Sequence, residues 1–305
     1  MKVFFDIPEI DEDTTIAIGT FDGVHKGHLE VLNKAKNIAK ENNQKFLVFT
    51  FIDHPSIVTG SKKVPFLLNT SEEKISNLKK IGVDYCVIPP FSKGLSMLYP
   101  EEFIKEILVG KLKAKNICVG FNFFFGYKAE GDGKLIKELS SKYNYSAYIL
   151  DSLVLDNETV SSSTIRNLIL NGEIEKANFL LGYEYFLKGN VIKGQGLGKS
   201  VLGIPTANLA VNGRKLVPKI SVYSCSIRIR NKEYNGVVNI GKRPTFDNGL
   251  RSIEAHILNF DDDIYDEQIE ISLKTRIRDE KKFDSFEELK NQIHKDIEDS
   301  RKLFK

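Results

Sequence analysis

Residues 15–32 read TIAIGTFDGVHKGHLEVL, and this stretch decides the fold of the first half of the chain. A short apolar strand ends near Phe21, a turn with glycines follows, and an amphipathic helix then begins. His25 and His28 stand at the start of that helix, three residues apart and therefore on one side of its first turn. The unpaired N–H groups and the dipole of a helix start favour phosphate, by roughly 0.3–1 kcal/mol per charge.

The histidine pair has two readings when it is taken alone. It could be two surface histidines beside a turn, because short motifs of this kind have many false positives. Alternatively, both imidazoles could donate hydrogen bonds to phosphoryl oxygens and follow the charge that develops in phosphoryl transfer. The full spacing G-x-F-D-G-x-H-x-G-H, on a strand, a turn and a helix, favours phosphate binding. Zinc is not expected, because no third ligand of a suitable type lies nearby in the sequence.

Composition restricts the class of protein. With 305 residues the chain has room for two domains, and 41% apolar with 28% charged residues is typical of a globular protein. A net charge of +3, with lysines scattered along the chain, predicts neither a nucleic-acid partner nor a membrane partner. The dispersed Cys86, Cys118 and Cys225 predict buried thiols in a reducing cytoplasm. We expect no signal peptide and no membrane span.

Apolar runs alternate with helical patterns through residue 183. The expected strands are Thr15–Phe21, Lys45–Phe51, Tyr85–Ile88, Asn116–Phe121 and Ala147–Leu150. The expected helices begin after His25, at a capping box Thr70–Glu73, and over Pro100–Leu112, Thr164–Leu170 and Ile174–Leu181. This α/β pattern predicts a parallel sheet covered on both faces, in a first domain of residues 1–183, with ligands at the carboxyl ends of the strands.

The second domain, residues 184–305, has a different pattern of apolar residues. Apolar and polar residues alternate at period two, as in Tyr223–Arg230, and glycine, asparagine and proline interrupt the runs. Many short strands without intervening helices predict a small antiparallel β-barrel. A last helix is expected from a capping box at Ser285, with Leu289, Ile293, Ile297 and Phe304 on its apolar face.

Two further stretches of the first domain suit a nucleotide and a planar ring. VSSSTIR, residues 160–166, offers Ser162 and Ser163 as donors at a helix start and the planar fork of Arg166, although a plain serine cap would look similar. GFNFFFGYKAEGD, residues 120–132, places aromatic rings at the end of a strand, where they could be core or could contact a planar ring system.

Together these motifs resemble the HxGH nucleotidylyltransferases, and in particular the FAD synthetase module of the prokaryotic bifunctional riboflavin kinase/FAD synthetases. TFIDHP, residues 50–55, also resembles this family's motif after the second strand. The resemblance implies a Rossmann-like first domain. The chain departs from the family at Phe124, where arginine is frequent.

The second half resembles the family's riboflavin kinase module. GNVIKGQGLGKSVLGIPTANL, residues 189–209, ends in the P-T-A-N-L element, and its G-K-S is not a P-loop because Lys193 replaces the earlier glycine. Thr206 and Asn208 lie two apart on an extended segment, so both oxygens face one side and suit Mg²⁺ with a nucleotide, although taken alone they could be ordinary polar groups at a strand end. Residues 252–265 and 276–283 also match. Ser221 and Asp266 depart from glycines of the family, and the likeness extends from about residue 14 to 303.

The resemblance implies a role for each matched position. In adenylyl transfer, ATP binding is implied for Gly19, Phe21, Asp22, Gly23, His25, His28, Asn122, Ser162, Ser163 and Arg166, and flavin binding for His54, Pro55, Asn122 and Phe125. In the kinase, ATP binding is implied for Gly194, Gly198, Lys199, Thr206 and Asn208, Mg²⁺ binding for Thr206 and Asn208, and flavin binding for Arg278 and Glu280. Catalysis is implied for His25, His28 and Arg166 in the first domain and for Glu254, as general base, in the second.

These residue types agree with the two reactions. A kinase must deprotonate the ribityl 5′-hydroxyl of riboflavin before it attacks ATP, which a carboxylate can do. Adenylylation of FMN to FAD needs alignment and charge neutralisation, which imidazoles and arginine supply. The alternatives are a kinase with a weak adenylyltransferase module, motivated by Phe124, and a flavin- or nucleotide-responsive protein without catalysis. An RNA-binding role is weaker still. The expected ligands are riboflavin, FMN, FAD and Mg²⁺-ATP, and the oligomeric state is not predicted.

Overall fold

The computed structural model describes residues 1–52, 66–194, 204–242 and 251–303. The chain forms two compact units, Met1–Ser162 and Ser163–Lys305. None of the helices in these described ranges has the length and apolar character needed to span a bilayer.

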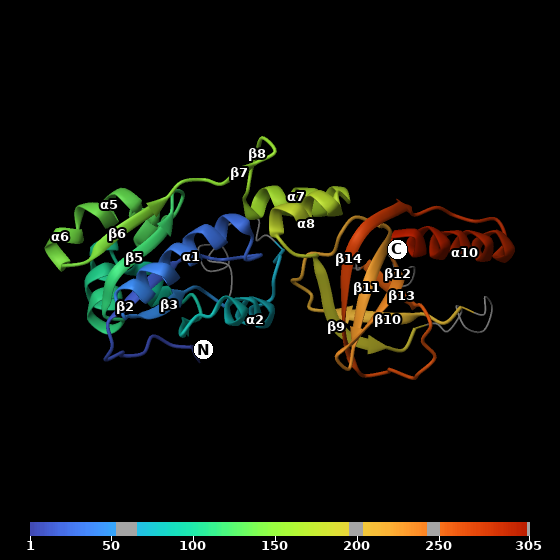
Figure 1. The fold of residues 1–305 in the computed structure, drawn as a ribbon, viewed down its shortest axis with the longest axis horizontal. Helices are drawn as coiled ribbons and strands as arrows, with labels where there is room; N and C mark the ends of the chain where they lie inside the picture. Colours follow the sequence, from blue (N-terminus) through green and yellow to red (C-terminus); the bar gives the residue numbers. More distant parts are fainter. Residues whose placement is uncertain (53–65, 195–203, 243–250, 304–305) are drawn as a thin grey trace. The chain divides into compact units, whose positions relative to one another are not determined.

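The first unit is built on a parallel sheet, as predicted, and this sheet has six strands, one more than the sequence indicated (Figure 1). Its order is β1 (Lys2–Phe4), β4 (Tyr85–Val87), β3 (Lys45–Phe49), β2 (Thr14–Ile18), β5 (Ala114–Gly120) and β6 (Ser146–Leu150). The helical segments are α1 (Lys26–Glu41), α2 (Ser71–Ile81), α3 (Lys93–Met97), α4 (Pro100–Glu102), the π-helix Phe103–Lys111, the 3₁₀ turn Tyr127–Ala129, α5 (Gly133–Glu138) and α6 (Ser140–Tyr143). A small hairpin, β7 (Val154–Leu155) with β8 (Glu158–Thr159), closes the unit.

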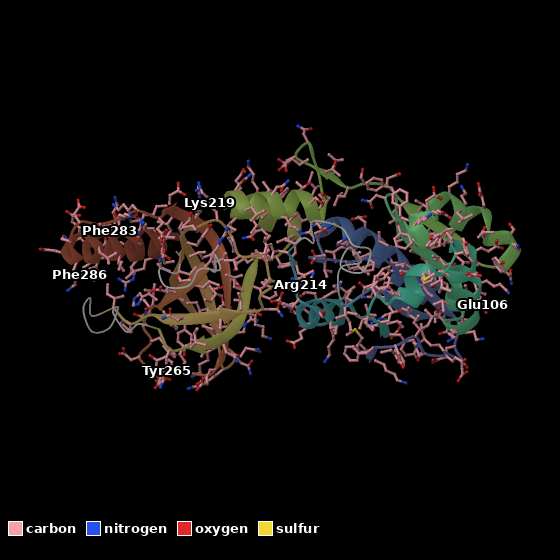
Figure 2. The ribbon with its side chains drawn as sticks, turned by 180° about the vertical axis from the view of Figure 1, so that it is seen from behind. Glu106, Arg214, Lys219, Tyr265, Phe283 and Phe286 are labelled. Carbon is pink, nitrogen blue, oxygen red and sulfur yellow. The ribbon has the colours of Figure 1, made fainter. Side chains whose placement is uncertain are left out.

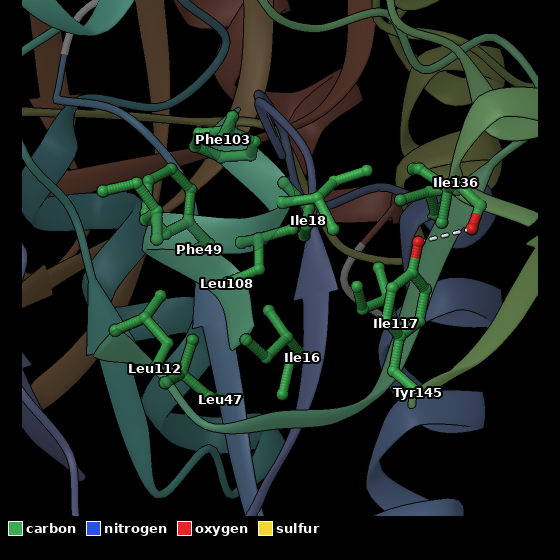
Figure 3. Close-up of a cluster of buried hydrophobic side chains, with 14 of the residues drawn as sticks. Ile16, Ile18, Leu47, Phe49, Phe103, Leu108, Leu112, Ile117, Ile136 and Tyr145 are labelled. Atoms are coloured by element: carbon green, nitrogen blue, oxygen red, sulfur yellow. Dashed lines mark hydrogen bonds between the residues drawn. The ribbon is translucent and has the colours of Figure 1, made fainter. Parts of the chain in front are cut away.

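The sheet is apolar on both faces because successive side chains of a strand point in opposite directions. Ile16 and Ile18 of β2 belong to a core cluster with the π-helix and α5, which Figure 3 shows around Phe103 and Leu108. Ala17, between them, packs on the other face with α1 and α2. At the edge of the first cluster, the Tyr145 hydroxyl donates to the Ile136 carbonyl oxygen at 2.5 Å (Figure 3).

Several elements differ from the sequence prediction. β2 ends at Ile18 rather than at Phe21, because Phe21 adopts a left-handed φ of 45° that no strand can contain. The single helix expected over Pro100–Leu112 is a short turn followed by a π-helix, in which the Leu112 N–H donates to the Ile107 carbonyl oxygen, five residues back. The edge strand β1 was not predicted. The capping box at Thr70 is confirmed, since its side chain accepts from the Glu73 N–H.

The second unit is a closed six-stranded antiparallel barrel, also as predicted (Figure 1). Around the barrel the strands are β10 (Ala207–Val211), β13 (Arg251–Ile257), β12 (Lys232–Lys242), β11 (Ser221–Ile229), β14 (Gln268–Asp279) and β9 (Phe186–Ile192). The terminal helix α10 (Phe286–Leu303) lies along the outside, where its Ile297 packs against Val222 and Val237. Phe304, expected on this face, lies outside the described residues.

Helices α7 (Ser162–Asn171) and α8 (Ile174–Leu181) precede the barrel. The α8 residue Asn178 donates from Nδ2 to the Leu273 carbonyl oxygen of β14 at 2.8 Å, and its Oδ1 accepts from the Tyr185 N–H at 2.7 Å. These contacts assign α8 to the second unit. The division into compact units falls after Ser162, whereas the expected domain boundary falls after residue 183, so α7 and α8 lie between the two positions. The expected boundary stays a prediction.

Candidate active sites

The first candidate site begins in the turn that follows β2. Phe21, Gly23 and Val24 have φ values of 45°, 89° and 38°, and the two non-glycine residues are buried. A β-branched residue such as Val24 seldom adopts this backbone, and its strain is on the order of 1–3 kcal/mol. At Gly19, a Cβ would lie 3.1 Å from the Phe21 ring, so this glycine admits the ring. The turn is thus held tightly in one uncommon shape.

His25 and His28 lie against each other at the start of α1. Their ring centroids are 3.5 Å apart with planes inclined by 16°, which is a stacked arrangement. His25 is the N-cap residue of α1, and its Nδ1 accepts the His28 backbone N–H at 3.2 Å. Because Nδ1 accepts, a neutral His25 carries its hydrogen on Nε2, which is then a donor for a ligand oxygen. The predicted common side of the two imidazoles is confirmed.

His28 is held in its neutral form. Burial, followed by the nearby His25 and Lys74, places the pKa of His28 well below its ordinary value of 6.5. Two stacked imidazolium charges would repel by about 4–5 kcal/mol at an effective dielectric constant of ~20. In the described part of the chain no group hydrogen-bonds the buried Nδ1 of His28. A buried polar atom of this kind suits a ligand that supplies the partner.

Asp22 connects this turn to two other segments. Its carboxylate accepts the backbone N–H groups of Leu68 at 3.0 Å and Asn69 at 3.1 Å, while its carbonyl oxygen accepts the Ser162 hydroxyl at 2.8 Å. A Cβ at Gly27 would lie 3.2 Å from the Val160 carbonyl oxygen and 3.3 Å from the His25 ring. The V-S-S-S element therefore reaches the histidine turn, as its proposed phosphate role requires.

Lys74 was missed by the sequence analysis. It is 6% exposed, and its ammonium donates to the carbonyl oxygens of Thr20 and Phe51, both at 2.9 Å. It thereby ties together the segments that follow β2 and β3 at the carboxyl edge of the sheet. Its sequence position could have indicated its burial, because Lys74 lies four residues before the buried Leu78 and therefore on the same, inward face of α2.

The aromatic run after β5 divides between the core and the surface. Phe125 is 8% exposed and stacks with Phe123, with ring centroids 5.5 Å apart. Phe124 is 61% exposed, and Asn122 is exposed as well. Any flavin contact of Phe125 is thus restricted to a small edge of its ring.

Four positions of the adenylyl set remain to be placed. His54 and Pro55 lie outside the described residues. Ser163 is exposed and Arg166 half-buried on α7, in the second unit. Their roles stay predictions.

The second candidate site is a row of polar residues across three strands of the barrel. Glu254 of β13 pairs directly with Asn208 of β10 on one side and with Asn239 of β12 on the other. Directly opposed residues share one face of a sheet, with Cβ atoms about 4.5–5.5 Å apart. Since Ile253 and Ala255 are buried inside the barrel, the row faces outward. Asn239 was not identified from sequence, because only strand pairing brings it beside Glu254.

Asn208 fits closely against Gly194. A Cβ at position 194 would lie 2.1 Å from Asn208 Nδ2, so only glycine leaves room for this amide. Gly194, Thr206 and Asn208 line a cavity of about 220 Å³, together with the loop Phe260–Tyr265, whose Tyr265 is labelled in Figure 2. The structure thus brings together three of the predicted ATP-binding residues. Gly198 and Lys199 lie outside the described residues.

His256 orients the segment that carries Thr206. Its Nδ1 lies 2.9 Å from the Pro205 carbonyl oxygen, which can only accept, so Nδ1 carries the hydrogen. His256 thereby fixes the start of the P-T-A-N segment.

The two predicted flavin residues of the kinase have different surroundings. Arg278 makes a forked ion pair with Asp296 of α10, Nη2 to Oδ2 at 2.7 Å and Nε to Oδ1 at 2.9 Å, and Asp296 is 2% exposed. Arg278 thus anchors the terminal helix. Glu280 is exposed and extends toward Gly241, where a Cβ would lie 2.8 Å from its Oε1.

The two departures from family glycines have different structural consequences. Asp266 adopts a left-handed φ of 64°, a conformation that favours glycine and that aspartate tolerates better than most residues. Ser221 has no such backbone; its buried hydroxyl lies 3.1 Å from Asp279 Oδ1, which Lys219 also contacts at 2.9 Å.

The oxygens of Thr206 and Asn208 suit Mg²⁺, which is commonly bound by few protein oxygens together with substrate phosphates. Asn208 sits in the space left by Gly194, at the edge of the cavity. The described residues contain no cluster of three or more His, Cys, Asp or Glu that could hold a metal. The oxygens of Thr206 and Asn208 fit a metal that is also bound by the phosphates of a nucleotide.

Comparison with known proteins places each unit. A protein-family model described as FAD synthetase matches residues 7–164, and a second family model, described as riboflavin kinase, matches residues 181–304. A Bacillus subtilis protein named bifunctional riboflavin kinase/FMN adenylyltransferase is 36% identical over 98% of this chain and 95% of its own length. A Listeria monocytogenes protein of the same name is 38% identical over 96% and 93%. A crystal structure described as a macrolide-efflux protein from Streptococcus pneumoniae has a TM-score of 0.90 at 29% identity, over 98% of both chains.

Proposed function

Because the chain belongs to the bifunctional riboflavin kinase/FMN adenylyltransferase family, we propose how its residues divide the two reactions between them. The chain phosphorylates riboflavin to FMN and adenylylates FMN to FAD, with ATP as co-substrate of both steps. The division assigns the kinase reaction to Glu254 and its neighbours and adenylyl transfer to the stacked histidines. It is carried by the direct pairing of Glu254 with Asn208 beside the cavity.

In the kinase reaction we assign the role of general base to Glu254. Its carboxylate takes the proton of the ribityl 5′-hydroxyl as the hydroxyl oxygen attacks the γ-phosphorus of ATP, and ADP leaves. Thr206 and Asn208 would hold Mg²⁺, which would neutralise phosphate charge when bound. Gly194 keeps the Asn208 amide in position, and His256 keeps Thr206 in position, which supports a preformed nucleotide site.

In the adenylyl reaction no base is needed, since the attacking FMN phosphate is already ionised. An FMN oxygen attacks the α-phosphorus of ATP and pyrophosphate leaves. His25 donates from Nε2 to a phosphoryl oxygen, a role supported by the engagement of its Nδ1. Neutral His28 accompanies it without placing a second positive charge in the stack. Ser162, Ser163 and Arg166 complete the assignment as phosphate ligands.

The proposal includes a reducing, cytoplasmic location, which the state of the cysteines supports. All three are free and buried. Burial raises the pKa of Cys86 to about 11 and that of Cys118 to about 12, so both remain unreactive thiols.

The test incubates the purified chain with riboflavin and Mg²⁺-ATP and follows FMN and FAD by chromatography. Glu254→Gln should lower FMN formation by about 10²–10⁴-fold and leave FAD formation from added FMN intact. His28→Ala should do the reverse, so each variant is the control for the other. A Glu254→Gln variant that phosphorylates riboflavin at the wild-type rate would contradict the base assignment. Robust turnover of FMN to FAD would also remove the alternative of a weak adenylyltransferase module.

A further inference from the structure

We propose that Asn239, Ser252 and Glu280, gathered around Gly241, bind the ribityl hydroxyls of riboflavin in the kinase reaction. This inference rests on the proposed role of Glu254 as the base of that reaction. We call these three side chains the polyol patch. It adds two residues, Asn239 and Ser252, that no sequence motif assigned.

The order of the strands separates the two substrates. Asn208 on β10 marks the nucleotide side of Glu254, because it lines the cavity together with Thr206. The opposite neighbour of Glu254 is Asn239 on β12. In a direct transfer the hydroxyl oxygen lies between the γ-phosphorus and the carbon chain of the alcohol, and the base accepts the hydroxyl proton from the side. With the nucleotide on the β10 side of Glu254, we infer that the carbon chain extends over β12.

The polyol patch lies on that side of the base. Ser252 pairs with Gly241, two residues before Glu254 on the same outward face of β13. A Cβ at Gly241 would lie 2.8 Å from Glu280 Oε1, 3.2 Å from Ser252 Oγ and 3.5 Å from Asn239 Nδ2. Polar side chains from β12, from β13 and from the residue that follows β14 thus converge on one point, the position that a side chain at Gly241 would occupy.

The chemistry of the patch matches a polyol. An amide, a hydroxyl and a carboxylate together donate and accept hydrogen bonds, as successive hydroxyl groups require. Within the described residues no side-chain hydrogen bond of Asn239, Ser252 or Glu280 is formed, although Asn239 and Ser252 are half-buried. These polar groups are gathered but unused, so a ligand with hydroxyls can satisfy them.

The test compares riboflavin with lumiflavin, which keeps the ring system but has a methyl group in place of the ribityl chain. The kinase rate of the full chain is measured as FMN plus FAD formed, and lumiflavin is added as a competitive inhibitor. Asn239→Ala and Ser252→Ala should each lower kcat/KM for riboflavin by about 2- to 12-fold, the effect of one neutral hydrogen bond. The inhibition constant of lumiflavin and the KM for ATP should stay unchanged.

Asn235→Ala is the matched control, because Asn235 lies on the same face of β12, four residues before Asn239, and is exposed. Gly241→Ala provides a second route, since its methyl group would fill the space and should lower kcat/KM for riboflavin without affecting ATP. Wild-type kcat/KM in both Asn239→Ala and Ser252→Ala would overturn the patch, and so would an equal loss of lumiflavin inhibition. A wild-type chain without kinase turnover would overturn the proposed function and the patch with it.

Discussion

Gly194 lies so close to Asn208 that one added methyl group should disable the kinase. A Cβ at position 194 would lie 2.1 Å from Nδ2 and 2.7 Å from Cγ of the Asn208 amide. Ordinary contact distances are about 3.5 Å, so the amide must move by about 1.4 Å. Overpacking of this kind costs about 1–3 kcal/mol. If the strain is relieved by displacing Asn208 from the nucleotide, kcat/KM for ATP in the kinase reaction should fall by about 5- to 150-fold.

The assay for Gly194→Ala has two internal comparisons. Gly213→Ala is the matched control, because a Cβ there meets no atom within 4 Å, and its kinase rate should equal that of the wild type. FAD formation from added FMN reports on the first unit and should be unchanged in both variants. A Gly194→Ala chain with a wild-type kcat/KM for ATP would refute the close fit and the nucleotide role of Asn208. An equal loss in Gly213→Ala would show that the effect is not specific to this contact.

Three further predictions concern stability. Since the pKa of His28 is lowered, only the unfolded chain takes up this proton as the pH falls below about 6.5, so the free energy of unfolding should fall by up to about 1.4 kcal/mol per pH unit. Urea melts between pH 7.5 and 5.5 should show this slope, and a slope that persists in His28→Gln would contradict the assignment. Asp296→Ala leaves the Arg278 guanidinium without its carboxylate partner and should lower the free energy of unfolding by about 3–5 kcal/mol. The double substitution Arg278→Met/Asp296→Leu should recover most of this loss. An Asp296→Ala variant as stable as the wild type would disprove the role of this ion pair in anchoring α10. Asp266→Val, at φ 64°, should cost about 1–3 kcal/mol in thermal unfolding while Asp266→Gly costs nothing, and equal stabilities of the two would count against backbone strain.

The sequence predicts most of the architecture because its local signals agree with the tertiary contacts. Apolar runs such as Lys45–Phe49 are buried on both faces, which is what a central parallel strand requires. The capping box at Thr70 begins α2 as expected. The three-residue β1 was missed because its burial depends on pairing with β4, and nothing in its own residues records that pairing. The turn at Phe21 was misplaced because left-handed backbone at a phenylalanine has no sequence signal.

The candidate sites were predictable only where their residues are close in sequence. His25 and His28 meet through helix geometry alone, so their spacing sufficed. Lys74, Asn239 and Asp296 contribute through partners far along the chain, and such contacts follow from strand register and helix docking. The apolar pattern of α2 indicates that Lys74 is a buried charge, but it does not identify the carbonyl groups to which the ammonium donates.

The two sites, as we assign them, hold phosphate by different physical means, and the difference follows from the reactions. In the first unit we assign the phosphate to a helix start and two stacked imidazoles, and the lowered pKa of His28 keeps a second positive charge out of that stack. This suits transfer between groups that are already anionic, where orientation and charge matter more than proton removal. In the second unit a carboxylate stands between two amides on a rigid barrel face. A base must remain close to one hydroxyl among several on the same polyol, so we infer that the amide on the β12 side selects which hydroxyl reaches Glu254.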